Sequence, residues 1–81
     1  MNQSFTDVAK TFRLNLARMM RERDYSQTDL AARANVAQTQ ISALLTGKTS
    51  PTLKTLCKLG KALDTSPDAL LRHEIENPGQ E

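Results

Sequence analysis

The segment from 26 to 46, SQTDLAARANVAQTQISALLT, constrains the fold of this chain more than any other. Ser26, with Asp29 three places later, forms the capping-box pattern that starts a helix. The apolar residues of this helix share one face and are Leu30, Ala31 and Ala34. Asn35 stands where the chain must leave the helix, and Asn adopts the left-handed backbone conformation more readily than any residue except Gly. The pattern therefore predicts a short helix that ends in a tight turn.

A second short helix is predicted after the turn, because Ile41, Leu44 and Leu45 form an inward apolar stripe and Val36 fills the corner. Its opposite side carries Thr39, Ser42, Ala43 and Thr46, with Gln38 in the first turn. No charged residue occurs from 38 to 46, although a solvated helix face is normally rich in Lys, Glu and Arg. This arrangement is typical of a helix-turn-helix whose second helix enters the major groove of DNA.

The ordered motifs of the chain are similar to those of the phage-repressor and Cro proteins, the XRE family. The matching elements are Ser26-Gln27-x-x-Leu30-Ala31, Asn35-Val36, Gln38-x-x-Ile41-Ser42, and Gly47 followed by Pro51. The pattern continues as LKTLCKLGKALDTSPDALL, so the resemblance covers roughly residues 10–71. It implies an all-α, five-helix, lambda-repressor-like DNA-binding domain over residues 1–71. Residues 72–81 lack periodicity and contain Pro-Gly, and we expect a short flexible acidic tail there.

The chain departs from the family pattern at three places. Asn35 replaces a frequent turn Gly, and Ala37 stands where a Ser or Thr usually caps the second helix of the motif, which forgoes about 1 kcal/mol of local stability. Many relatives pair an Arg late in the first helix with a Glu late in the third, at the positions of Met20 and Leu45. Replacing a buried ion pair by packed apolar side chains is often neutral. We therefore expect Met20 and Leu45 to touch and to be largely buried.

Helical periodicity and caps predict five helices and no strands. The expected helices span about 6–23, 27–34, 38–45, 53–63 and 67–71. The expected apolar face of the first helix is Phe5, Val8, Phe12, Leu16 and Met19. The expected apolar face of the fourth is Leu53, Leu56, Cys57, Gly60 and Leu63, with Cys57 packed in the core as a small hydrophobe.

Composition excludes several classes of function. The 81 residues suffice for one small core. Residues 1–71 carry ten basic and six acidic side chains, and this net charge of +4 gives only a modest attraction to polyanions. Aromatic residues make up 4%, too few to stack on unpaired bases. We expect no membrane span, signal peptide, catalytic residue, metal site, cofactor or small-molecule ligand, and His73 is a lone imidazole. The single cysteine suits a reducing, cytoplasmic location.

The candidate DNA contacts fall into two groups. Gln38 has the amide geometry to bond adenine N6 and N7, and the base-contacting set is Gln38, Thr39, Ser42 and Ala43. Gln27, in the first turn of its helix, is expected to bind phosphate together with free backbone N–H groups. The resemblance implies phosphate contacts at Lys48 and Thr49, and Lys54 is a further candidate. Arg18, Arg21 and Arg23 are interpreted as a solvated face.

The expected partners are double-stranded DNA and a second copy of the chain. One motif reads only a few base pairs, and the family arrangement places a dimer surface near Thr65, Pro67, Leu70 and Leu71. The sequence thus predicts a transcriptional regulator of repressor or controller type that binds a two-fold operator. The alternative is an antitoxin or other protein-interaction module in which DNA binding is secondary. The operator, an effector, and the choice between activation and repression stay open.

Overall fold

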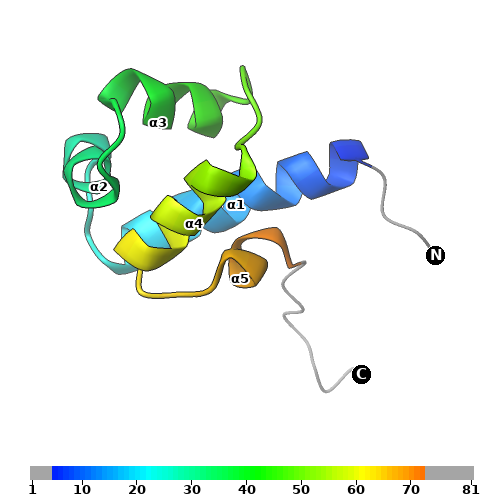
Figure 1. Ribbon diagram of the computed structural model, residues 1–81. Coiled ribbons are helices and arrows are strands. Elements are labelled where there is room, and N and C mark those ends of the chain that lie inside the picture. The colour runs from blue at the N-terminus through cyan, green and yellow to red at the C-terminus, as the bar shows by residue number, and fades with distance from the viewer. Residues whose placement is uncertain (1–4, 73–81) are drawn as a thin grey trace.

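The computed structural model describes residues 5–72. They form the helices α1 (Phe5–Glu22), α2 (Gln27–Ala34), α3 (Gln38–Thr46), α4 (Leu53–Ala62) and α5 (Pro67–Leu71), as drawn in Figure 1. Each bound lies within one residue of its predicted position, and the all-α class is confirmed. Apart from Arg72, the tail predicted at 72–81 lies outside the described residues, as does His73.

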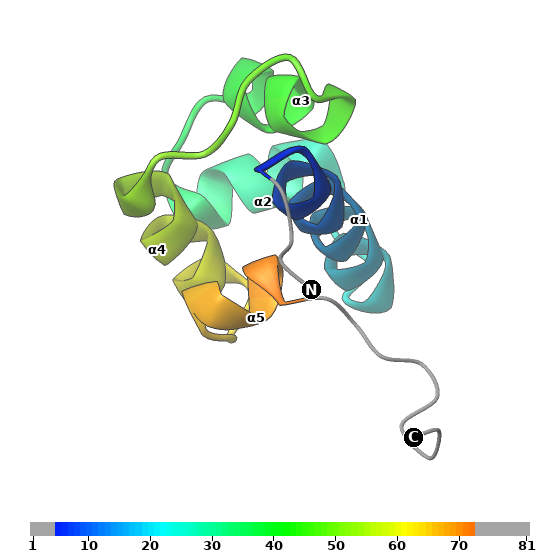
Figure 2. The same ribbon diagram turned by 90° about the vertical axis from the view of Figure 1, so that its right-hand side faces the viewer.

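The long helix α1 packs directly on two of the other helices. It packs against α3 on one side and α5 on another, while α2 contacts α3 and α4, and α4 contacts α5. In both views α3 lies at the top of the molecule and α5 at the bottom (Figures 1 and 2). The fully buried side chains at the centre are Leu16, Leu30, Ile41, Leu44, Leu59, Leu63 and Leu70. Helix α3 is thus held on a core to which all five helices contribute.

The two ends of α2 form as the sequence predicts. The Ser26 backbone N–H donates to Asp29 Oδ2 at 2.9 Å, and the Asp29 N–H donates to Ser26 Oγ at 3.0 Å, which completes the capping box. Both hydrogen bonds with Ser26 lower the pKa of the Asp29 carboxyl, and the bond to the Ser26 backbone has the larger effect. At the other end Asn35 takes the left-handed conformation with φ of 58°. The next helix then begins at Ala37 without a side-chain cap, as expected.

Helix α4 corrects one prediction. Leu53 is 81% exposed and Cys57 is also exposed, so neither belongs to the buried face. That face is set by Leu56, Leu59 and Leu63, three and then four residues apart, and each successive residue turns by about 100°. Cys57 and Leu53, four residues apart, therefore share the outward side of α4.

A buried glycine brings α4 close to the chain that leads into α5. A Cβ atom at Gly60 would lie 2.9 Å from the Thr65 carbonyl oxygen and 3.1 Å from the Pro67 nitrogen. Backbone atoms cannot yield as a flexible side chain can, so the position has no room for a methyl group. Gly60 thereby fixes how tightly the 65–67 turn packs on α4.

Two polar side chains cap the C-terminal ends of other helices: Asn15 lies in α1, and Arg23 lies in the turn after it. Asn15 is buried, and its Nδ2 donates to the carbonyls of Leu70 and Arg72, both at 2.9 Å. Arg23, predicted to be part of a solvated face, is instead half-buried and donates from Nε to the Leu63 carbonyl at 2.9 Å. The carbonyls at helix C-termini lack partners within their own helix, which explains why these donors are drawn inward. Arg18 keeps a partly exposed ion pair with Glu22 at 3.2 Å.

Candidate nucleic-acid interface

The outer side of α3 carries the four residues predicted to contact bases. Gln38 and Thr39 are exposed, while Ser42 and Ala43 are half-buried. At about 100° per residue, Thr39, Ser42 and Ala43 fall within one arc of the helix, and Gln38 projects from its first turn. The structure therefore brings the predicted set to a common surface.

The inner side of α3 is anchored to the rest of the fold. Ile41 and Leu44 are buried in the core. Between them and the outer side, the half-buried Gln40 donates from Nε2 to Thr55 Oγ1 of α4 at 3.2 Å. Sequence reasoning missed Gln40, because nothing in the motif separates it from Gln38. Its contact with α4 makes it a residue that positions α3.

The predicted phosphate-contacting residues lie at helix ends. Gln27 is the first residue of α2 and is half-buried, and Lys54 is exposed in the first turn of α4. Lys48 and Thr49 are exposed in the turn after Gly47, which ends α3 with φ of 82°. Helix N-termini and short loops of this kind present donors to anions.

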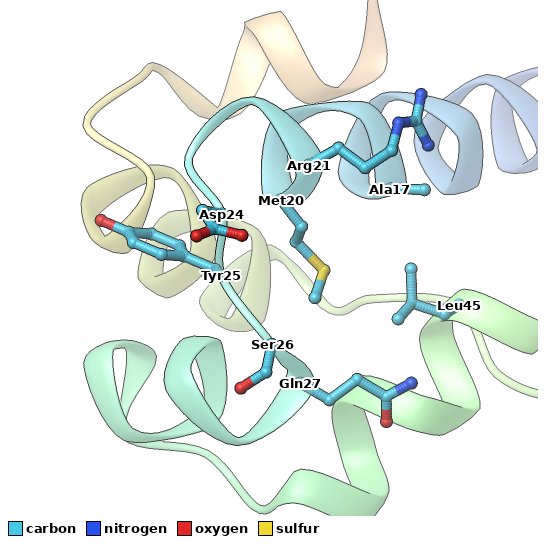
Figure 3. Close-up of a pocket in the computed structure, with 8 residues that line it drawn as sticks. All are labelled: Ala17, Met20, Arg21, Asp24, Tyr25, Ser26, Gln27 and Leu45. Carbon is cyan, nitrogen blue, oxygen red and sulfur yellow. The ribbon is translucent and has the colours of Figure 1, made fainter.

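Beside Gln27 lies an open hollow of about 510 Å³ between α1, α2 and α3 (Figure 3). Met20 reaches into it from α1 and Leu45 from α3, and the Gln27 amide extends toward α3. Met20 is buried, as predicted, whereas Leu45 is only half-buried because the hollow opens to solvent. The two positions at which the resemblance implied an ion pair in many relatives are therefore apolar here, and polar side chains complete the lining of the hollow: Arg21, Asp24, Ser26 and Gln27.

The residues predicted for a dimer surface differ in what they can offer a partner. Leu70 is 0% exposed and belongs to the core, whereas Leu71, Thr65 and Pro67 are half-buried. One of the two adjacent leucines therefore enters the core and the other retains accessible surface. Leu70 has no surface left for a partner, so a contact there would run through Leu71 and the turn before α5.

The comparisons with known proteins bear on this motif directly. The Helix-turn-helix family profile matches residues 16–70, which cover the C-terminal part of α1 from residue 16 onward, all of α2 to α4, and all but the last residue of α5. The chain belongs to this XRE-type helix-turn-helix family. It is 35% identical over 72 residues, 89% of this chain and 94% of the relative, to an uncharacterized HTH-type transcriptional regulator, y4dJ, of Sinorhizobium fredii (strain NBRC 101917 / NGR234). No solved structure gives a significant match.

Membership of the helix-turn-helix family indicates a DNA-binding regulator rather than an enzyme. In residues 5–72 no group of His, Cys, Asp and Glu side chains is arranged to hold a metal ion. Within the same residues, no helix combines the length and the apolar character needed to cross a membrane. The resemblance expected from the motifs is thus confirmed at the level of the family.

Proposed function

We propose that this protein is a sequence-specific transcriptional regulator that places α3 in the major groove of double-stranded DNA. The observation that carries the proposal is the outer side of α3, which is accessible and uncharged from Gln38 to Thr46, while its inner side is fixed by Ile41 and Leu44. A helix held in this way can present hydrogen-bonding side chains to base edges without reorganising. A DNA target also fits the cytoplasmic location expected from the sequence.

In this proposal each predicted residue has one role. The side chains that contact bases are Gln38, Thr39, Ser42 and Ala43. The side chains that contact phosphates are Gln27, Lys48, Thr49 and Lys54. Phosphate contacts set the register and orientation of the protein on the duplex, and base contacts select the sequence.

We further propose that two copies bind a two-fold operator. One motif of this size contacts too few base pairs for useful specificity, and two copies about 34 Å apart would contact successive major grooves on one side of the duplex. Leu71, Thr65 and Pro67 retain accessible surface that a second copy could cover. Occupation of such an operator would block or recruit polymerase according to its position in the promoter.

Selection of bound duplexes from a random-sequence pool tests this function and identifies the operator in the same experiment. We expect enrichment of an inverted repeat whose half-sites are centred about 10 base pairs, or a multiple of that, apart. Enrichment of a single half-site would contradict the two-fold arrangement but not the proposed DNA-binding function. Recovery of no preferred sequence, despite cooperative thermal unfolding of the protein, would overturn the proposed function.

A further inference from the structure

Arg13 of α1 lies against the turn that ends α3. A Cβ atom at Gly47 would be 3.0 Å from Arg13 Nη1 and 3.5 Å from its Cζ, so the guanidinium covers the Gly47 backbone. Gly47 is followed at once by the exposed Lys48 and Thr49. The positive charge of Arg13 therefore adjoins the segment proposed to hold a DNA phosphate, although Arg13 is far from that segment in the sequence.

The N–H donors of the Arg13 guanidinium are unpaired within the described residues. Arg13 is half-buried, and it makes no hydrogen bond or ion pair with any residue of the described range 5–72. The other two half-buried arginines in that range do have acceptors, since Arg18 bonds Glu22 and Arg23 bonds the Leu63 carbonyl. A guanidinium stays charged at neutral pH and carries five N–H donors, and partial burial of such a charge favours an anion beside it.

The backbone N–H groups of the two residues that follow Gly47 are already used within the protein. The N–H groups of Lys48 and Thr49 both donate inward to the Ala43 carbonyl, at 2.9 and 3.4 Å. A phosphate beside Lys48 and Thr49 would therefore be held mainly by side chains. A guanidinium pairs with two phosphate oxygens at once, whereas a lysine ammonium acts as a single point of charge.

We propose that Arg13 binds a DNA phosphate together with Lys48 at the C-terminal end of α3, an inference that rests on the DNA-binding function proposed above. The pair would set the depth at which α3 enters the groove, because both cations are tied to the turn that ends the helix. An intramolecular role is the competing explanation, since a cation near a helix C-terminus is also stabilised by the helix dipole. Only phosphate binding predicts a change in the salt dependence of DNA affinity.

The test compares Arg13→Gln, Arg13→Lys and the wild type on a mixed-sequence duplex at several salt concentrations. The matched control is Lys61→Gln, which removes one positive charge from the last turn of α4, at the end of that helix away from α3 in Figures 1 and 2. We expect Arg13→Gln to lower the slope of log affinity against log salt by about 0.9 and to weaken binding about fivefold to tenfold near 0.1 M salt. Arg13→Lys should keep most of the slope, and Lys61→Gln should keep all of it.

The outcomes separate this inference from the function on which it rests. If the wild type binds DNA and Arg13→Gln binds it with the same slope of log affinity against log salt, the assignment of Arg13 is overturned, whatever the substitution does to thermal stability. A wild type that binds no DNA would overturn the proposed function itself. If the shorter Gln side chain destabilises the fold, Arg13→Met keeps an apolar stem over Gly47 and must show the same loss of slope.

Discussion

At the scale of single residues, the capping box of α2 makes stability depend on pH. The hydrogen bonds from Ser26 lower the pKa of Asp29 in the folded protein, so its carboxylate stabilises the fold above the unfolded-state pKa of about 3.9. That contribution is lost as the pH falls through the lowered folded value. Thermal unfolding followed by circular dichroism should show a steeper decline below about pH 4 for the wild type than for Asp29→Asn. Asp68→Asn, which removes a carboxylate outside the capping box, is the control, and parallel curves for wild type and Asp29→Asn would contradict the assignment.

The missing cap of α3 is a second feature of single residues. Ala37 already has the extended backbone of a cap, with φ of −73° and ψ of 145°, but no side-chain oxygen. Ala37→Ser should therefore add about 1 kcal/mol of stability and raise the unfolding midpoint by about 4–8 °C. Ala32→Ser, at an exposed position in the middle of α2, should give no gain in stability, because serine within a helix is a poorer helix former than alanine. An unchanged midpoint in Ala37→Ser would show that the first N–H groups of α3 gain nothing from the added hydroxyl.

These local features could be predicted because each depends on neighbours in sequence. Ser26 with Asp29, and Asn35 at the turn, act within one helical turn, so the bounds of α2 followed from the residue order. The exposed face of α3 followed in the same way from its period. The contacts of Asn15 with α5 and of Gln40 with Thr55 could not be predicted, because they depend on how two helices pack together.

At the scale of elements, the hollow between α1, α2 and α3 should tolerate a restored ion pair. Leu45→Glu places a carboxylate beside apolar groups, but Leu45 is half-buried, so we expect a loss of about 1–3 kcal/mol. Adding Met20→Arg should recover part of that loss, since the two side chains line the same hollow (Figure 3). Urea unfolding of the two single variants and the double variant gives the coupling energy, which we expect to be at least about 0.5 kcal/mol. Additive effects would show that the two positions do not interact.

The packing of whole elements also explains where prediction from sequence failed. Apolar residues surround α4 on more sides than its core contact needs, so the period alone did not exclude Leu53 and Cys57 from the buried face. Arg23 was assigned to solvent because charged neighbours flank it, yet the end of α4 lies within its reach. Arg13 was overlooked for a similar reason, since only the tertiary fold brings it to Gly47.

At the scale of the whole molecule, the proposed dimer depends on the surface around Leu71. Sedimentation at micromolar concentration should show a dimer that Leu71→Asp dissociates. Leu53→Asp changes a more exposed leucine outside the proposed surface and should leave the dimer intact. Each variant is first checked for cooperative thermal unfolding, because Leu71 also packs on the core. A wild type that stays monomeric, or a dimer that only Leu53→Asp dissociates, would contradict the proposed interface.

The central claim is that the outer side of α3 selects the DNA sequence, and Gln38→Ala tests it most directly. Affinity is measured by titration for the selected duplex and for the same duplex with each base pair changed in turn. We expect Gln38→Ala to lose about 1–3 kcal/mol of discrimination at one base pair of each half-site and to keep its preferences elsewhere. Lys48→Ala, in contrast, should weaken binding to every sequence about equally. If Gln38→Ala discriminated all base pairs as the wild type does, α3 would not contact the bases through Gln38.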